Sequence, residues 1–218
     1  MIKLAPSILS ADMGYLAKEV RNAEQAGADL LHIDIMDGNF VPNITFGSAI
    51  VDAIRKETKL LLDVHLMVKH PERHVRSFIN AGGDIITVHI EACNGNIVSL
   101  INEVHNHGKK VGVAIKLGTP LSKIAPILNS VDIVLLMSVE PGFAGQAFDK
   151  RVLHRIEALR KMRCENGYNF EIEVDGGIKT QIASLVVQAG ATVLVAGSAL
   201  FEQVDIKKAL QDLREELC

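Results

Sequence analysis

Eight short runs of apolar and β-branched residues alternate with eight longer amphipathic stretches along this 218-residue sequence, and this alternation restricts the fold more than any other feature. Each run is almost continuously apolar, which is typical of parallel strands covered on both faces. The predicted strands are Ile2–Leu9, Leu30–Ile35, Leu60–Leu66, Asp84–His89, Lys110–Ile115, Asp132–Met137, Phe170–Val174 and Thr192–Val195. The predicted helices are Asp12–Ala26, Gly47–Glu57, Pro71–Ala81, Ile97–His107, Leu121–Leu128, Lys150–Glu165, Gln181–Ala189 and Ile206–Leu217.

Eight strand–helix units in a chain of this length predict an α/β fold, a compact TIM (β/α)8 barrel that takes up residues 1–218 as a single domain. A doubly wound open sheet is the alternative, because the number of strands alone does not establish closure. Three predicted helices run into related tetrapeptides, Ala26–Asp29, Ala81–Asp84 and Ala189–Thr192, each with Gly in second place. We expect that Gly to adopt the left-handed conformation that ends a helix.

Charge and composition exclude several classes of protein. The net charge is -3 and the basic residues are scattered, which argues against a nucleic-acid or anionic-membrane surface. No apolar run reaches the roughly 18–20 residues that span a bilayer, and the N-terminus lacks the apolar core of a signal peptide. Cys93, Cys164 and Cys218 are far apart and odd in number, so we expect reduced thiols. The sequence therefore predicts a cytoplasmic protein that binds neither nucleic acid nor membrane.

Polar residues gather at the ends of the second, third and seventh predicted strands, which is the end where a TIM barrel places its active site. His32 and Asp34 share one face of the second strand because strand side chains alternate. His65 ends the third strand and Asp175 follows the seventh. Taken singly, His32 suits a hydrogen-bonded core histidine, and a turn explains an Asp before Gly. Two His and two Asp at one barrel end instead predict a site for one divalent metal ion, Zn2+, Fe2+, Mn2+ or Co2+.

Glycines follow three successive predicted strands. The segment Glu140–Gln146 follows the sixth strand, Gly176 and Gly177 the seventh, and Gly197 and Ser198 the eighth. Glycine lets the backbone approach an anion and turn its N–H groups toward it. Tight turns alone would also use glycine, but its recurrence at three neighbouring strand ends favours a phosphate-binding site.

Other titratable residues receive structural interpretations. Lys116 and Glu173 are predicted to form an ion pair inside the barrel, because residues from odd strands share layers. The remaining histidines with suggestive spacing are predicted to lie on the surface: His70, His74, His105, His107 and His154.

Longer sequence blocks resemble a known family. The blocks are His32-Ile33-Asp34-Ile35-Met36-Asp37-Gly38-Asn39-Phe40-Val41-Pro42-Asn43, Val64-His65-Leu66-Met67, Glu140-Pro141-Gly142-Phe143-Ala144-Gly145-Gln146 and Val174-Asp175-Gly176-Gly177-Ile178. In order and spacing they resemble the ribulose-phosphate 3-epimerases over essentially the whole chain, from Ala5-Pro6-Ser7-Ile8-Leu9 to Val195-Ala196-Gly197-Ser198-Ala199.

The resemblance implies roles for individual residues. It implies that His32, Asp34, His65 and Asp175 bind the metal, and that Asp34 and Asp175 are also the two acid–base groups. The implied substrate-binding residues are Ser7, His65, Gly142, Phe143, Ala144, Gly145, Gly176, Gly177, Gly197 and Ser198. The implied reaction inverts C3 of a small phosphorylated ketose, D-ribulose 5-phosphate to D-xylulose 5-phosphate, through a metal-stabilised enediolate in the pentose phosphate pathway.

Three alternatives to this activity stay open. A 3-epimerase of a hexulose phosphate, such as D-allulose 6-phosphate, would use the same metal and acid–base residues. A sugar-phosphate decarboxylase would need a Lys beside the departing carboxylate, and the second strand has none, which leaves only Lys116. A non-catalytic sugar-phosphate-binding protein would not need the pair Asp34 and Asp175. TIM barrels often form oligomers, so a homo-oligomer is expected.

Overall fold

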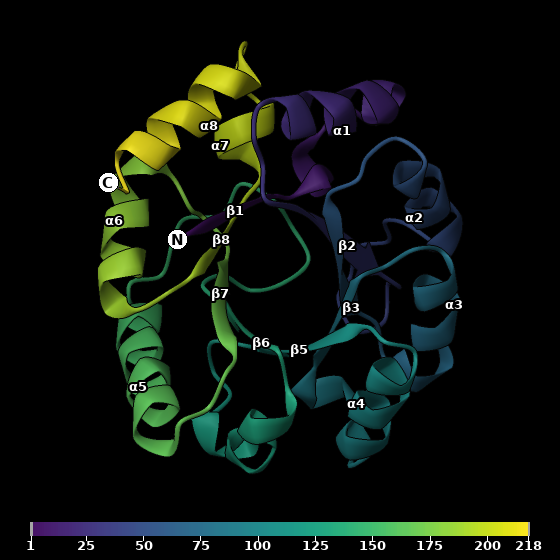
Figure 1. Ribbon diagram of the computed structural model, residues 1–218, viewed down its shortest axis with the longest axis vertical. Helices are drawn as coiled ribbons and strands as arrows, with labels where there is room; N and C mark the ends of the chain where they lie inside the picture. Colours follow the sequence, from purple (N-terminus) through teal and green to yellow (C-terminus); the bar gives the residue numbers. More distant parts are fainter. Residues whose placement is uncertain (1, 218) are drawn as a thin grey trace.

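The computed structural model of the protein describes residues 2–217, and within them parallel strands form one eight-stranded sheet surrounded by helices (Figure 1). The strand order is β1-β8-β7-β6-β5-β4-β3-β2. The strands are β1 (Lys3–Pro6), β2 (Leu30–Met36), β3 (Leu61–Met67), β4 (Ile85–His89), β5 (Lys110–Ile115), β6 (Ile133–Met137), β7 (Glu171–Asp175) and β8 (Val193–Ala196).

The two ends of this strand order, β1 and β2, meet and close the barrel. A parallel bridge joins Ser7, just beyond β1, to His32 on β2. Near the base, the backbone N–H of Asp29 donates to the carbonyl of Leu4 at 3.1 Å. The TIM barrel prediction is therefore confirmed, and the open doubly wound sheet is wrong.

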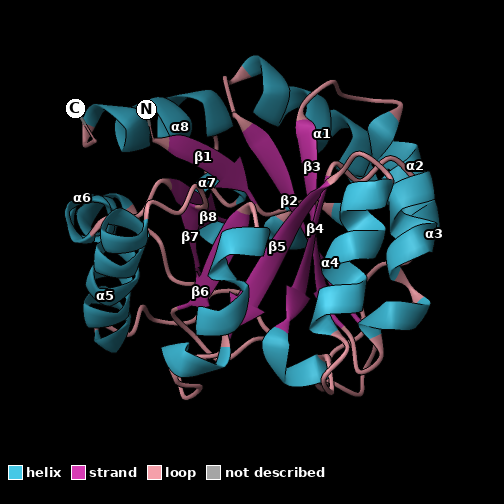
Figure 2. Ribbon diagram, turned by 60° about the horizontal axis from the view of Figure 1, so that its bottom comes forward, coloured by secondary structure: helices cyan, strands magenta, loops and turns pink. Residues whose placement is uncertain are grey.

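The helices pack outside the strands (Figure 2). They are α1 (Leu16–Gln25), α2 (Ser48–Arg55), α3 (Val75–Asn80), α4 (Ile97–Asn106), α5 (Arg151–Asn166), α6 (Thr180–Ala189), α7 (Ser198–Phe201) and α8 (Ile206–Glu215). The α-helix predicted at Leu121–Leu128 is wrong, because this segment forms two 3-10 turns, Leu121–Lys123 and Ala125–Ser130. Pro126 has no N–H to donate, and its ring would clash with the carbonyl one α-helical turn earlier.

One hydrogen-bonding arrangement recurs at the base of the barrel. The side chain just before each even-numbered strand accepts a hydrogen bond from a backbone N–H of the odd-numbered strand that precedes it in the sequence. The pairs are Leu4 N–H to Asp29 at 2.8 Å, Leu62 to Asp84 at 3.1 Å, Val111 to Asp132 at 2.9 Å and Ile172 to Thr192 at 3.0 Å. This arrangement explains why three of these residues end the related tetrapeptides. The preceding glycines, Gly27, Gly82 and Gly190, have φ of 91°, 101° and 126°, so the predicted left-handed positions are confirmed.

The apolar core lies mainly between the sheet and the surrounding helices. Because every second strand residue points inward, the barrel interior can hold polar side chains without interrupting that outer core. Cys93 is buried and Cys164 is exposed; neither forms a disulfide within residues 2–217, and Cys218 lies outside them. In the same part of the chain, no helix is long and apolar enough to cross a membrane.

Candidate active site

The inward faces of β2 and β3 bring polar side chains together at the barrel axis. In the register of these strands His32 lies beside Asp63, and Asp34 lies beside His65. All four residues are buried. The predicted alternation on the second strand is therefore confirmed, and it turns His32 and Asp34 toward the same side as His65.

Four of the predicted residues converge on one point. His32 Nε2 lies 3.3 Å from Asp34 Oδ1, and His65 Nδ1 lies 3.0 Å from the same oxygen. The two imidazole nitrogens are 3.3 Å apart. Together with Asp175 on β7, each residue offers one ligand atom, and these atoms lie within 4.8 Å of one another. The structure thus gathers the predicted metal set from three strands.

The chemistry of this donor set fits a divalent cation. His32 Nδ1 lies 2.7 Å from Asp63 Oδ2, so this nitrogen donates its proton to Asp63. Nε2 faces the Asp34 oxygen, and in the neutral ring it carries a lone pair. This buried contact therefore needs a positive charge, which either a second proton on the ring or a metal cation would supply. Carboxylate support of a ligating histidine from behind is also common in metal sites.

The pKa values follow from the same contacts. Burial opposes the charge on His32, but Asp34 and Asp63 outweigh it and raise the pKa of His32 well above its usual value. Burial likewise disfavours the Asp34 carboxylate, yet His32 and His65 hold the pKa of Asp34 far below its usual range. Removal from bulk water and the charge on Asp34 raise the pKa of Asp175 to about 6. The two aspartates are therefore driven in opposite directions.

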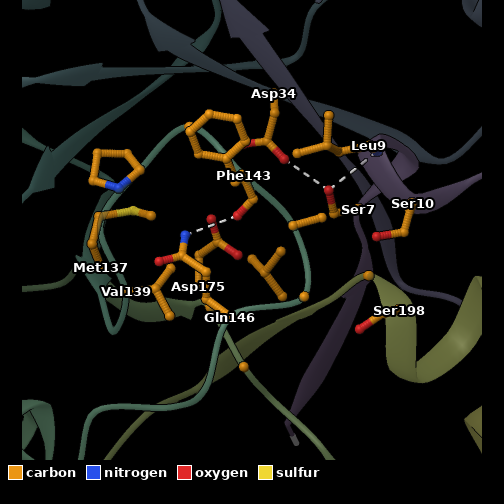
Figure 3. A pocket seen from close by; sticks show the side chains of 18 of the residues that line it. Ser7, Leu9, Ser10, Asp34, Met137, Val139, Phe143, Gln146, Asp175 and Ser198 are labelled. Atoms are coloured by element: carbon orange, nitrogen blue, oxygen red, sulfur yellow. Dashed lines mark hydrogen bonds between the residues drawn. The ribbon is translucent and has the colours of Figure 1, made fainter. Parts of the chain in front are cut away.

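A pocket opens above these residues at the carboxyl ends of the strands. Asp34 and Asp175 line it, as do Met36, Met67 and Met137. The predicted substrate residues that line it are Ser7, Gly142, Phe143, Ala144, Gly145, Gly176, Gly177, Gly197 and Ser198. His65, the remaining one, is fully buried at the barrel axis. Figure 3 shows Ser7 turned toward Asp34, where its hydroxyl donates to Asp34 Oδ2 at 2.7 Å, and Ser198 at the start of α7.

The glycines on this rim are required by the backbone. Gly142, Gly145, Gly176 and Gly177 have φ of 122°, 75°, 115° and 63°, in the region that side chains disfavour. A Cβ on Gly177 would also lie 2.5 Å from the backbone nitrogen of Phe148. Positive φ favours glycine at all four positions, and close packing requires it at Gly176 and Gly177, where a Cβ would meet Val139 and Phe148.

Comparison with known proteins agrees with this geometry. The model of the ribulose-phosphate 3-epimerase family matches residues 3–201. The chain belongs to this family. It is 48% identical over 215 residues to ribulose-phosphate 3-epimerase of Bacillus subtilis, covering 98% of this chain and 99% of the relative. It is 40% identical over 215 residues to the Escherichia coli ribulose-phosphate 3-epimerase, covering 98% and 95%.

Solved structures share the fold of this epimerase family member at much lower sequence identity. KGPDC from Streptococcus mutans has a TM-score of 0.73 at 13% identity, covering 100% of this chain and 98% of that one. A 3-hexulose-6-phosphate synthase has a TM-score of 0.72 at 19% identity, with both chains fully covered. At these identities the likeness shows the barrel fold alone.

The predicted ion pair between Lys116 and Glu173 is wrong. Glu173 lies on β7 at the level of Leu135 and Ala114, two residues deeper in the barrel than Lys116. The Lys116 ammonium instead lies over the ring of Phe40, 4.2 Å from its centroid. Among residues 2–217, the Lys116 ammonium makes no ion pair with Asp34 or Asp175 either. Glu173 Oε1 lies 3.6 Å from His32 Nδ1, so the neighbours of Glu173 are His32 and Asp63.

Several buried polar residues of this family member escaped the sequence analysis. Asp63 supports His32, and His89 at the end of β4 contacts His65, Nε2 to Nε2, at 2.9 Å. Strand alternation could have revealed Asp63, because it lies two residues before His65 and therefore on the same face of the strand. His89 ends a predicted strand and could have been found in the same way. The histidines predicted at the surface are at least partly exposed, as expected: His70, His74, His105, His107 and His154.

Proposed function

We propose that this protein interconverts D-ribulose 5-phosphate and D-xylulose 5-phosphate with the help of one divalent metal ion, in the pentose phosphate pathway. The observation that carries the proposal is the meeting of the Asp34 and Asp175 carboxylates with two imidazole nitrogens beside a pocket with a glycine-rich rim. The names of the bacterial relatives support the substrate. A single domain over residues 1–218, the cytoplasmic location and the homo-oligomer stay predictions.

Under this proposal His32, Asp34, His65 and Asp175 would hold the metal ion. When bound, the cation would supply Lewis-acid stabilisation of the negative charge that develops on the substrate oxygens. The metal could be Zn2+, Fe2+, Mn2+ or Co2+, since a set of two nitrogens and two carboxylates suits each of them.

Asp34 and Asp175 would exchange the proton at C3. One carboxylate takes the proton from C3, and the electron pair of the broken C–H bond forms the C2–C3 double bond while the C2 oxygen gains the charge. The other carboxyl group then delivers its proton to the opposite face of C3, and the C2 carbonyl forms again. In the metal-free site the pKa of Asp34 is low and that of Asp175 is about 6, so the surroundings of the two carboxyl groups differ as an acid–base pair requires.

The glycine-rich rim would bind the phosphate. Gly142, Gly145, Gly176 and Gly177 combine positive φ with places on the pocket wall, which lets backbone N–H groups approach an anion. Binding energy from this remote group can serve the chemical step. Ribulose without the phosphate should therefore turn over more slowly as well as bind more weakly.

The first test is to incubate the metal-loaded protein with ribulose 5-phosphate in heavy water and follow the sugar by NMR. Because two different groups handle the proton, we expect xylulose 5-phosphate with deuterium at C3. Chelation should stop the conversion and added Mn2+ or Co2+ should restore it. If the protein with confirmed bound metal converts no pentulose phosphate, the proposed substrate is wrong, and D-allulose 6-phosphate becomes the next one to assay.

The acid–base assignment has its own test. Asp34→Asn and Asp175→Asn should each abolish conversion when the metal content of the variant is restored to that of the natural protein. Asp52→Asn, on the exposed side of α2, provides the matched control and should retain activity. Near-normal turnover by either active-site variant at full metal occupancy would remove that residue from the mechanism.

A further inference from the structure

A chain of buried contacts runs from the proposed metal site to the barrel rim. His65 Nδ1 lies 3.0 Å from Asp34 Oδ1, His65 Nε2 lies 2.9 Å from His89 Nε2, and His89 Nδ1 lies 3.1 Å from Glu91 Oε2. Both imidazoles are fully buried, while the Glu91 side chain is 20% exposed. Within residues 2–217, Asp34 and Glu91 are the carboxylates at the two ends of this chain.

The number of protons in this chain of contacts is limited. Two neutral imidazoles bring two N–H groups, but the chain has three gaps: Asp34 to His65, His65 to His89, and His89 to Glu91. One gap must therefore be left with two lone pairs facing each other. Only when the empty gap is the one between Asp34 and His65 does His65 Nδ1 offer a lone pair to a metal.

The other end of the chain is fixed by the backbone. Glu91 Oε1 accepts the backbone N–H of Lys116 at 2.9 Å, which leaves Oε2 to face His89. A carboxylate at this position can only accept, so it draws the proton of His89 to Nδ1. His89 Nε2 must then accept, and this draws the proton of His65 to Nε2.

We propose that Glu91 and His89 are positioning residues that keep the proton of His65 on Nε2, so that Nδ1 stays free to bind the metal. The inference rests on the proposed metal site. It assigns to His65 the same kind of support that Asp63 gives directly to His32.

We call this sequence of contacts, in which Glu91 sets the tautomer of His89 and His89 sets that of His65, the relay. Glu91→Gln should reverse both tautomers with little change in side-chain size. The amide oxygen must accept from the backbone N–H of Lys116, so the amide NH2 faces His89 and donates to Nδ1. His89 then carries its proton on Nε2 and donates to His65, whose own proton moves to Nδ1. Glu72→Gln is the control, because it removes the same charge from an exposed side chain, on the 3-10 turn Pro71–Arg73.

Metal affinity and tautomers test the relay independently of catalysis. Titration with Co2+, followed by its visible absorption, should show binding by Glu91→Gln weakened roughly 10- to 100-fold relative to the natural protein. Glu72→Gln should bind like the natural protein. In metal-free protein at pH 8, 15N NMR of the imidazoles should place the His89 proton on Nδ1 in the natural protein and on Nε2 in Glu91→Gln.

A second pair of variants tests the relay in case Glu91→Gln does not fold. His89→Gln keeps an oxygen that can accept from His65 Nε2–H, whereas His89→Leu keeps none, so His89→Gln should bind Co2+ more tightly. Unchanged affinity and tautomers in Glu91→Gln, or equal affinity in the two His89 variants, would overturn the relay while the metal site stands. If the natural protein itself does not bind Co2+, the proposed metal site fails and the relay fails with it.

Discussion

Glu173 offers the sharpest test of the electrostatics inside this barrel. Its side chain is fully buried on β7, and neither carboxyl oxygen has a hydrogen-bond partner among the described residues. Burial, together with the charge on Asp63, raises the pKa of Glu173 to about 8. The folded protein therefore holds a proton here that the unfolded chain has lost at neutral pH. Glu173→Gln should stabilise the metal-free protein, because an amide has no charge to lose and can donate to Asp63.

The size of this effect follows from proton linkage. The ordinary pKa of Glu is 4.5, and the folded value of about 8 lies above it. Each pH unit between these two values lowers the unfolding free energy of the natural protein by about 1.4 kcal/mol. No such penalty exists below pH 4.5, and at pH 7 it reaches about 3 kcal/mol. The advantage of Glu173→Gln should grow with pH across this window and level off above pH 8.

Urea unfolding in the presence of a chelator, at several pH values from 5 to 8, measures this difference. The chelator matters because a cation near His32 would favour the ionised form of Glu173. Glu171→Gln is the matched control on the same strand, since Glu171 is partly exposed and forms an ion pair with Lys3. It should destabilise the protein by less than about 1 kcal/mol. A Glu173→Gln advantage that does not change between pH 5 and pH 8 would refute the raised pKa.

Two further substitutions test the barrel base and the glycine-rich rim. Asp84→Ala removes an acceptor from the backbone N–H of Leu62 and two ion pairs, with Arg55 and Lys109, so urea unfolding should show a loss of about 2 kcal/mol. Exposed Asp52→Ala should lose less than about 0.5 kcal/mol, and an equal loss would contradict the role of Asp84. Gly177→Ala should raise KM for ribulose 5-phosphate and lower the unfolding temperature, because its Cβ would meet the backbone of Phe148. Gly27→Ala also has positive φ but meets nothing within 4 Å, so similar effects of both changes would argue against a steric cause.

The fold could be predicted because local signals agreed along the chain. Continuous apolar runs gave strand positions to within a few residues, and the tetrapeptides with glycine gave helix ends such as Gly27 and Gly190. The segment at Leu121–Leu128 failed because its apolar spacing suits a helix while Pro126 prevents an α-helix. Closure could not be read from strand count, since it depends on the contact of Ser7 with His32 across the first and second strands.

The residues of the site could be predicted from the sequence, but the ion pairs and hydrogen bonds between them could not. Strand alternation indicated that His32 and Asp34 share a face, and that is how they lie. The ion pair of Lys116 with Glu173 failed because odd-numbered strands alone do not define a layer. Level in the barrel depends on register, and register places these residues two positions apart. The hydrogen bond from Ser7 to Asp34 likewise needs the closed barrel.

Register also explains why His32 and His65, the two histidines of the proposed metal site, have different support. The β3 neighbour of His32 is Asp63, so a carboxylate reaches its ring directly. The β4 neighbour of His65 is Thr87, which already donates to Asp63 at 2.9 Å. Support for His65 must then come from His89, the next residue of β4 that points into the barrel, and from Glu91 at the rim. A change at Asp63 would take an acceptor from both His32 and Thr87 in the core, whereas Glu91→Gln can move the proton of His65 to Nδ1 and leave that core intact.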